Sequence, residues 1–495
     1  MQYRLEQIQR MLLFFTILFL PFGAIPKQIT IQSFGTILSR YTLYIGIIFF
    51  VIELIVYPIH RNRKFLFFFI FVYITALISL GLGVAYYPYR QLQYFHVYKL
   101  EKFLEIVPIN ISYDNLLPWW IFFRGIKNVT LDLVIYFLFP YQVYCLFKGN
   151  KLDGFNFIKK AFIVLAIFMG LYSLMEIPYL LFNAGISKKL LMLTTPWFTD
   201  VSGGYNWWPP LIWKGQLRSL CPEPPHFGII AAICEAFLMY EYINNKTWAK
   251  KGILSIMLFY FTLMIFLSKA RTALGLFLGE GALFFIYLLF QTQKKEYIKS
   301  FIKLCIIVGL SFLCTLLPAY MAGNRGNLAK EYAKEYIENN IASVKESNAR
   351  SNGTRLVMAK SCWQVGINHP VWGVGKDLKD VYILPYAQFY GHNDPEIKLW
   401  LEGYSKNGPL KSPFPTTNQF LLIFSEYGAV GVFFFLCPMA LCGWKLWKNK
   451  KQLHDIKIAT IFIILSGQVV AMFSAVGWIT YPLFLGLLFS EFEDE

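Results

Sequence analysis

The sequence HPVWGVG at residues 369–375 lies in a long polar stretch that leads into the apolar sequence NQFLLIFSEYGAVGVFFFL at residues 418–436. Arg355 and Trp363 precede HPVWGVG in the same polar stretch. Apolar runs of roughly 17 to 25 residues, enough to cross a hydrocarbon core of about 30 Å, recur on both sides of it. A large arginine-bearing loop between such runs indicates chemistry at a membrane face, on a substrate that is part lipid and part polar.

The composition indicates an all-α polytopic membrane protein. The chain has 495 residues, of which 56% are hydrophobic and only 15% are charged, whereas soluble domains carry about 25% charged residues. The formal charge of +17 suggests nucleic-acid binding at first sight. However, much of the excess Lys and Arg falls in short clusters between apolar runs, which is typical of membrane topology. We therefore expect membrane lipid as a partner and no nucleic acid.

The apolar runs predict about twelve membrane spans, and the basic clusters orient them. Each basic cluster follows an even-numbered span, so these loops, both termini and the acidic tail are predicted to be cytoplasmic. The first span is expected to be uncleaved, because no small-residue cleavage site follows it. The predicted spans are residues 11–25, 40–59, 65–85, 129–147, 158–182, 227–243, 252–268, 271–290, 302–321, 418–446, 456–473 and 475–490.

This topology divides the chain into three parts. Residues 1–322 hold spans one to nine, with exterior loops at 86–128 and 183–226, and residues 418–495 hold the last three spans and the acidic tail. Residues 323–417 form a large exterior loop between spans nine and ten. Within it we predict helices at Leu328–Val344 and Thr354–Gly366, the second stopped by Pro370 and followed by an irregular stretch.

Four arginines at the predicted exterior face are candidates for binding phosphate. Arg271 stands between two apolar runs with almost no loop, so it is held at the membrane rim, where an arginine is a functional candidate by default. Guanidinium groups bind phosphate oxygens in a bidentate manner. Arg218 follows the same logic, with snorkelling to lipid phosphate as the alternative for both. Arg350 and Arg355 lie in the large loop, where a solvated helix face is the alternative.

Glu223 is the first candidate for a general base, because prolines on both sides fix its backbone direction. A simple ion pair with Arg218 is the alternative. His226 is a weaker candidate base. The Trp-rich segment 194–226 that carries these residues is expected to lie along the outer membrane interface, as an anchor or a sugar-stacking platform.

Other polar and small residues favour structural roles. Five carboxylates within the predicted spans indicate polar pairing or a proton path: Glu53, Asp132, Glu176, Glu235 and Glu280. Gly275 and Gly279 form a small-residue face that predicts helix packing. Cys221 and Cys362 could pair, although spacing alone does not establish proximity. No histidine or cysteine spacing indicates a metal site, so we predict neither metal nor cofactor.

Taken together, the motifs from Arg218 to Gly431 resemble the O-antigen ligase/polymerase superfamily. They are Arg218 with Glu223-Pro224, Ser268-Lys269-Ala270-Arg271, Arg355 with Trp363, residues 369–375, and Asn418-x-Phe-Leu with Glu426, Gly428 and Gly431. The resemblance implies a metal-independent membrane glycosyltransferase with a GT-C-like fold in the bacterial inner membrane. Such enzymes move a glycan from undecaprenyl diphosphate to an acceptor sugar at the periplasmic face, and arginines hold the diphosphate.

Within that superfamily the sequence favours a polymerase for O-antigen, capsule or a similar polysaccharide. Members often have His before the Asn at position 418, and ligases are thought to use such a histidine, whereas this chain has Thr417 there. His392-Asn393 is a displaced equivalent that keeps a ligase open. A lipid-linked glycan flippase is the alternative from another class. Lipid-linked repeat units, an acceptor glycan and a chain-length regulator are the expected partners.

Overall fold

The computed structural model describes most of the chain as helices. It describes residues 2–31, 34–57, 62–86, 97–107, 112–149, 153–201, 215–291, 294–317, 334, 338, 352–408, 412–448 and 454–492. Arg350, the Trp-rich residues 207–213, and the predicted helix Leu328–Val344 apart from Lys334 and Glu338 lie outside these residues. Within the described ranges there is no strand, which agrees with the predicted all-α class.

Nine described helices are long and apolar enough to cross a membrane. They are α2 (Leu38–Val56), α3 (Arg63–Ala85), the continuous helix α5–η4–α6 (Tyr113–Phe147), α7 (Gly154–Phe182), α9 (Pro224–Asn244), α10 (Trp248–Ser268), α11 (Arg271–Leu289), α12 (Lys294–Thr315) and α18 (Gln419–Lys448). The other three predicted spans fall on shorter helices, α1 (Gln2–Leu18), α19 (Ile456–Ala471) and α20 (Thr480–Glu491). The count of twelve spans therefore stays a prediction.

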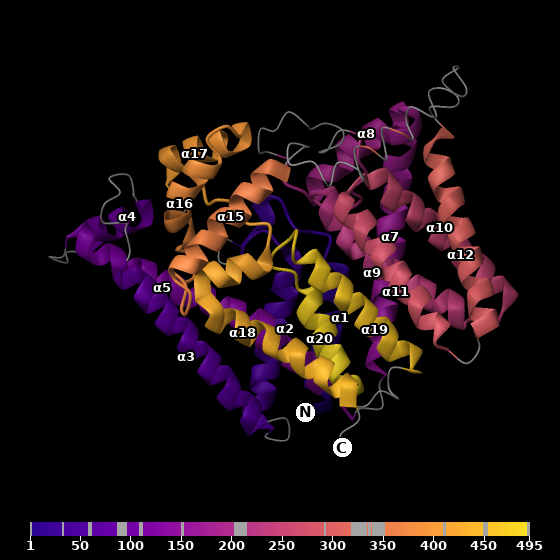
Figure 1. Cartoon of the computed structure of the whole chain (residues 1–495), viewed down its shortest axis with the longest axis horizontal. Coiled ribbons are helices and arrows are strands. Elements are labelled where there is room, and N and C mark those ends of the chain that lie inside the picture. Colours follow the sequence, from indigo (N-terminus) through magenta and orange to yellow (C-terminus); the bar gives the residue numbers. More distant parts are fainter. Residues whose placement is uncertain are drawn as a thin grey trace.

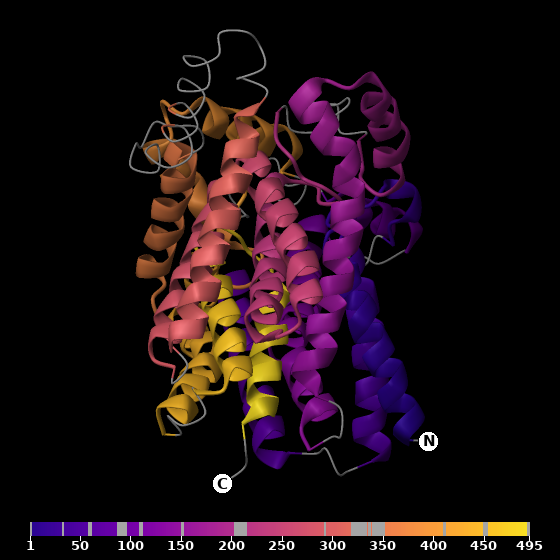
Figure 2. The same ribbon diagram turned by 90° about the vertical axis from the view of Figure 1, so that its right-hand side faces the viewer.

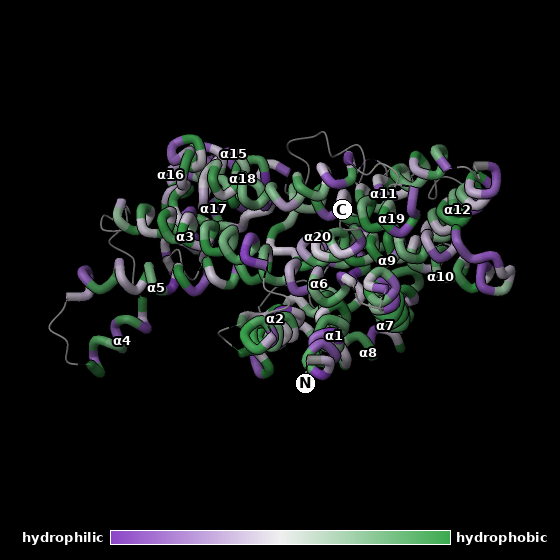
Figure 3. Tube along the Cα trace, turned by 90° about the horizontal axis from the view of Figure 1, so that it is seen from below, coloured by the Kyte–Doolittle hydropathy of each residue, from purple (hydrophilic) through white to green (hydrophobic). Residues whose placement is uncertain are grey.

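The long helices run side by side, and the short helices gather at one end of the bundle (Figure 1, Figure 2). That end carries α8 (Gly185–Thr194), α15 (Asn352–Asn368), α16 (Lys379–Tyr390) and α17 (Pro395–Asn407), and both termini lie at the opposite end. Most of the length of the long helices is apolar (Figure 3). The arrangement places the helices of the large loop together at one end of the bundle.

Two hydrophobic clusters hold the described residues together. One lies among α1, α7, α9 to α11 and α18 to α20. The other joins α3, α4 (Tyr98–Ile106) and α5 to α15, α16 and α17. The loop helices therefore have no separate core, because they pack on α3 and α5 instead.

The quoted HPVWGVG sequence completes a broken helix. α18 leaves helical geometry at Gly428, whose φ of 65° favours glycine. The break frees backbone groups that must be satisfied in the interior. Val374 N and Gly375 N donate to the carbonyls of Ser425 and Glu426 at 3.0 and 2.8 Å, and Ala429 N donates to Pro370 O at 2.8 Å.

Close backbone approach explains the glycines of this motif. A Cβ at Gly428 would overlap the carbonyl of Val371, and one at Gly373 would lie 2.5 Å from the backbone of Glu426. Ser79 of α3 caps the junction, because its hydroxyl donates to the carbonyls of Trp372 and Glu426 at 2.5 and 2.9 Å. The motif that carried part of the family resemblance is thus a structural joint between the loop and α18.

Several predictions about local structure need correction. The helix ending at Phe147 begins at Tyr113, so that residues 113–128 of the predicted loop 86–128 are helical. The stretch after Pro370 is not irregular throughout, since it contains α16 and α17; Pro395 occupies the first turn of α17, where proline is tolerated. The predicted helix Thr354–Gly366 is confirmed as α15, which ends before Pro370.

Two predicted contacts are also wrong. A Cβ at Gly275 or Gly279 would meet no described atom within 4 Å, so this face packs against nothing in the described chain. The close approach of α11 is made instead by Ala273, which lies against Gly228 of α9. Cys221 and Cys362 are free and belong to different hydrophobic clusters, so they do not form a disulfide.

Candidate functional site

A cavity of about 560 Å³ lies where the loop helices meet the ends of α9, α10 and α11. We call it the cationic cavity, because Lys269, Arg271 and Arg355 line it. Its other lining residues are Gln216, Glu223, Pro224, Pro225, Ala270, Thr272, Thr354, Glu396, Trp400, Pro415 and Thr417. The sequence predicted Glu223, Arg271 and Arg355 separately, and the structure brings all three to this one cavity.

The turn between α10 and α11 supplies two of the three cations. Lys269 ends α10 with a left-handed φ of 50°, which is uncommon for a residue other than glycine. The buried hydroxyl of Ser268 donates to Ile265 O at 2.7 Å and accepts from Ala270 N at 3.3 Å. This fixed two-residue turn puts Lys269 and Arg271 on the same cavity wall.

Glu223 stands at the start of α9, directly before Pro224 and Pro225. Its extended backbone ends the preceding loop, and its exposed side chain makes no cap bond to the helix. His226 lies one turn further into α9, where its ring packs edge-on against Trp478 at 5.1 Å. The carboxylate of Glu223 therefore lines the cationic cavity, whereas His226 does not line it.

Arg218 has a different environment from the other candidate arginines. Its side chain is fully buried, and its Nη1 donates to Cys221 O at 2.6 Å. Its Nε lies 4.0 Å from Oε1 of Glu176, and Oε2 of Glu176 accepts from the backbone N of Arg218 and Ser219 at 3.2 and 2.8 Å. Arg218 was predicted to contact substrate, but its side chain has no exposed surface in this structure and does not line the cationic cavity.

The alternative prediction for Glu223 was a simple ion pair with Arg218. The ion pair of Arg218 is with Glu176 of α7 and not with Glu223. Arg218 instead fixes the segment that connects to α9, and Leu217 N bonds to Leu267 O at 3.0 Å, tying that segment to the end of α10. Arg218 is therefore a positioning residue for the wall that carries Glu223.

The loop helices supply the opposite wall. Arg355 is exposed in the first turn of α15, beside the buried Thr354. The hydroxyl of Thr354 lies 3.0 Å from Oε2 of Glu396 and 2.9 Å from Oδ2 of Asp394, both at the start of α17. Thr354 thus connects α15 to α17 and holds Glu396 at the cavity.

Sequence reasoning missed several residues of this wall and misplaced one. Lys269 stood in the quoted Ser268–Arg271 motif without a role, and Glu396 and Trp400 lay in a stretch read as irregular, although Asp394-Pro395-Glu396 is a typical helix start. His392 lies in the connection between α16 and α17, where its Nδ1 is 3.1 Å from Phe389 O. His392 is exposed and does not line the cationic cavity.

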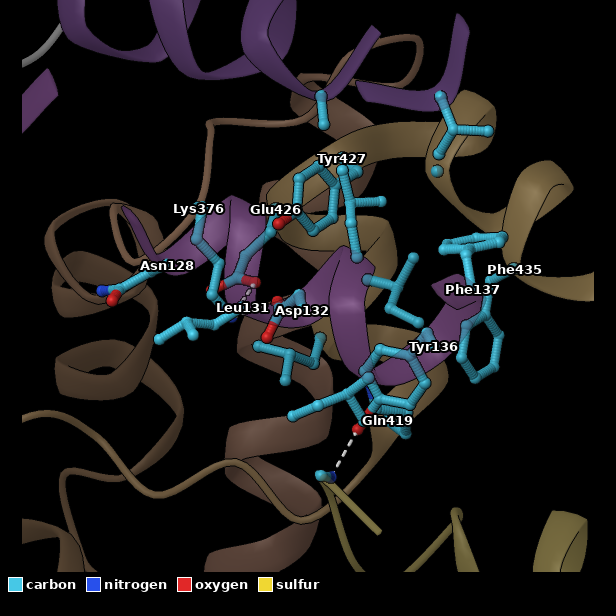
Figure 4. Close-up of a pocket in the computed structure, with 18 of the residues that line it drawn as sticks. Asn128, Leu131, Asp132, Tyr136, Phe137, Lys376, Gln419, Glu426, Tyr427 and Phe435 are labelled. Atoms are coloured by element: carbon cyan, nitrogen blue, oxygen red, sulfur yellow. Dashed lines mark hydrogen bonds and ion pairs between the residues drawn. The ribbon is translucent and has the colours of Figure 1, made fainter. Parts of the chain in front are cut away.

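A second cavity, of about 490 Å³, opens between α2, α3, α5 and α18, at the break in α18. We call it the lateral cavity. At one end Lys376 lies 2.9 Å from Asp132, 3.2 Å from Glu426 and 3.8 Å from Asp377 (Figure 4). Burial opposes the charge of Lys376, but these carboxylates outweigh burial and hold the pKa of Lys376 well above its usual value.

Four of the five carboxylates predicted within spans fall into this and other polar pairs, whereas Glu280 is buried and its Oε1 has no hydrogen-bond partner among the described residues. Asp132 belongs to the lateral cavity and Glu176 to the Arg218 pair. Glu53 accepts from Gln9 at 2.5 Å, and Glu235 accepts from Thr262 at 2.6 Å. These four are dispersed over separate pairs, which gives the polar-pairing alternative its support.

Residues 256–436 match the family model described as O-antigen ligase. This segment is similar to the O-antigen ligase family. The match spans the α10–α11 turn, α15 to α17 and the break in α18, so the predicted resemblance to the O-antigen ligase/polymerase superfamily is confirmed over these elements. A comparison with curated proteins finds no match for the chain.

The match to the O-antigen ligase family model agrees with the location of the cationic cavity. Lys269, Arg271, Arg355, Glu396 and Trp400 all fall within the matched segment. The apolar helices indicate a multi-pass membrane protein, and the match supports a role in polysaccharide biosynthesis. Glu223 lies outside the matched segment, and its place in the cavity comes from the structure alone.

Proposed function

We propose that the protein is a polysaccharide polymerase that transfers an undecaprenyl-diphosphate-linked glycan onto the sugar of a second lipid-linked repeat unit. The observation that carries the proposal is the cationic cavity, where three cations and two carboxylates meet at the ends of membrane helices. The active site would face the periplasm, with both termini in the cytoplasm, as the basic clusters predict.

Lys269, Arg271 and Arg355 would hold the donor diphosphate. The diphosphate leaves with the electron pair of the bond to the anomeric carbon, so negative charge grows on its oxygens in the transition state. Fixed cations aimed at that charge stabilise it without rearrangement. The rigid turn that carries Lys269 and Arg271 meets this requirement, and the three cations supply the charge by themselves, so the proposal needs no metal.

Glu223 would act as the general base. It would take the proton of the acceptor hydroxyl while that oxygen attacks the anomeric carbon and displaces the diphosphate, with inversion at that carbon. A carboxylate can serve if it lies within hydrogen-bond reach of the proton that it takes. Glu396 is the other carboxylate of the cavity, but its Oε2 is already engaged by Thr354 at 3.0 Å.

A polymerase fits the cavity better than a ligase. Thr417 lines the cavity at the position where ligases carry a histidine, and His392, the displaced equivalent, lies outside it. A ligase that transfers glycan to lipid A core or protein remains the alternative of the same class.

A flippase is favoured by one observation, the break in α18, because transporters bind substrate at broken helices. At this break, however, backbone groups of residues 370–375 satisfy the freed groups of α18, so they are not available to a transported substrate. Movement of labelled lipid-linked glycan across liposomes without bond formation would support the flippase.

The test is an assay of the purified protein with its lipid-linked repeat unit, the products being separated by size. We expect a ladder of longer lipid-linked glycans and release of undecaprenyl diphosphate. A single transfer that requires added lipid A core or peptide would make the protein a ligase instead. Arg355→Gln is the matched variant, because the Arg355 side chain is exposed and lines the cavity. We expect the longer glycans to form more slowly in this variant, while its folding is unchanged.

A further inference from the structure

The lateral cavity contains a polar end that the proposed transfer leaves unused. Asn128, Asp132, Lys376, Asp377 and Glu426 gather there, and Figure 4 shows Lys376, Asp132 and Glu426 turned toward one another. The rings of Tyr136, Phe137 and Phe435 lie on the other side of the cavity (Figure 4). Polar groups at one end and apolar walls at the other match an amphipathic ligand.

The cavity lies between the two hydrophobic clusters. Tyr44, Ile135 and Ile423 on its walls belong to the first cluster, whereas Val72 and Ala76 belong to the second. α2 packs mainly on α1, and α3 packs on α5 and α18, so α2 and α3 stand apart across the cavity (Figure 3). Ile37, Arg40 and Tyr44 of the α2 region and Val72, Thr75 and Ala76 of α3 all line the cavity between these helices.

Arg40 gives the cavity its anion-binding capacity. It lies in the first turn of α2 and lines the cavity beside Gly477. Its Nε is shielded from solvent and has no hydrogen-bond partner among the described residues, and no described carboxylate lies within ion-pair distance of it. Arg40 is half-buried, and a guanidinium nitrogen that is shielded from solvent without a partner is costly unless a ligand pairs with the group.

The two ends of the cavity carry different groups and therefore suit different parts of such a ligand. Lys376 is already neutralised by its carboxylates, so Arg40 is the group that suits phosphate. Carboxylate and amide oxygens at the other end accept hydrogen bonds from hydroxyl groups. The cavity thus fits a prenyl lipid in which a phosphate group carries a sugar.

The lateral cavity is adjacent to the cationic cavity. Thr417 lines the cationic cavity, and Gln419, two residues later, lines the lateral one. Gln419 is fixed by bonds from its N to Met472 O at 2.8 Å and from Gly477 N to its Oε1 at 2.9 Å. Ser474 of the same segment lies 3.4 Å from Thr272 of the cationic cavity. Residues 417–419 and 472–477 form the wall between them.

We infer that the lateral cavity is the binding site of the acceptor lipid, a glycosylated prenyl (di)phosphate whose phosphate pairs with Arg40. The acceptor role rests on the proposed function; the binding of an anionic prenyl lipid does not. The acceptor would enter between α2 and α3, with its phosphate at Arg40, beside the wall that separates the two cavities, and its hydroxyl groups toward the carboxylate and amide oxygens at the other end.

The test counts lipids bound to the full-length protein in detergent by native mass spectrometry, with undecaprenyl diphosphate as the probe. We expect two equivalents on the unmodified protein. Arg40→Gln should weaken one of them about tenfold or more, since hydrogen bonds to charged groups contribute about 1.5–3 kcal/mol. Arg40→Lys keeps the charge and should retain most of the binding.

A second variant tests the cavity without changing charge. Ala76→Trp should fill the cavity and exclude the lipid that depends on Arg40. Ile78→Trp, at an exposed position of the same helix, should leave both lipids bound. Two equivalents at unchanged affinity in both Arg40→Gln and Ala76→Trp would overturn the inference. Displacement of this equivalent by phosphatidylglycerol at equal concentration would also overturn it, because the site would then take any anionic lipid.

The donor site and the lateral site can be refuted independently of each other. Arg271→Gln should remove the other equivalent and leave the one that depends on Arg40. If Arg271→Gln keeps both equivalents while Arg40→Gln loses one, the lateral site is supported and the proposed donor site is wrong.

Discussion

Arg218 and Arg271 look alike in the sequence, since both stand just before a membrane helix, yet their surroundings differ. Arg218 is fully buried against Glu176 and the carbonyl of Cys221, whereas Arg271 lines a cavity with two other cations. A side chain with no exposed surface is closed to a ligand, whereas a side chain that lines a cavity is open to one. The comparison teaches that an arginine that lines a cavity is a candidate for ligand binding, whereas an arginine buried within its own fold indicates a structural role.

The largest expected effect comes from breaking the buried pair. Arg218→Gln leaves the Glu176 carboxylate buried without a countercharge, so we expect a loss of about 3–5 kcal/mol in stability. Thermal unfolding in detergent measures it. Adding Glu176→Gln should restore part of the melting temperature. A melting temperature unchanged by Arg218→Gln would show that the pair contributes nothing to the fold.

Glu223→Gln should act on the reaction rather than on the fold. Loss of a general base is expected to slow transfer at least about a hundredfold, and the exposed side chain makes no cap bond whose loss would lower stability. The initial rate of transfer checks this, with Glu396→Gln as the matched control. A larger loss in Glu396→Gln would assign the base to α17.

The break in α18 is a structural counterpart to Arg218. Gly428→Ala forces a Cβ into a backbone conformation at φ 65° and against the carbonyl of Val371. We expect a loss of about 1–3 kcal/mol, from strain of this kind. Gly443→Ala in the same helix meets no described atom and serves as the control in the same unfolding measurement. Equal melting temperatures of the two variants would contradict the structural role of the break in α18.

The smallest effect is expected at the face predicted to pack but found open. Gly275→Ala should change stability by no more than about 0.5 kcal/mol, as surface substitutions usually do. Gly228→Ala, which would meet Ala273, should lower the melting temperature clearly. A large loss in Gly275→Ala would indicate that another helix or a second copy covers this face.

The sequence predicted the helical class and the candidate residues Glu223, Arg271 and Arg355, because span length and charge at a membrane rim are local properties. It did not separate Arg218 from Arg271, since burial depends on Glu176, 42 positions away in another helix. It also missed the pairing of residues 370–375 with the break in α18, because the glycines are explained only by a distant backbone. Contacts between separate helices decided both of these errors.

The assignment of the cationic cavity as the donor site is tested most directly by the transfer rate of Arg271→Gln, measured per folded molecule with the lipid-linked repeat unit. We predict a rate about a hundredfold lower, corresponding to about 3 kcal/mol of lost charge stabilisation, with an unchanged melting temperature. A normal rate in a protein that folds normally would contradict this account of the cavity.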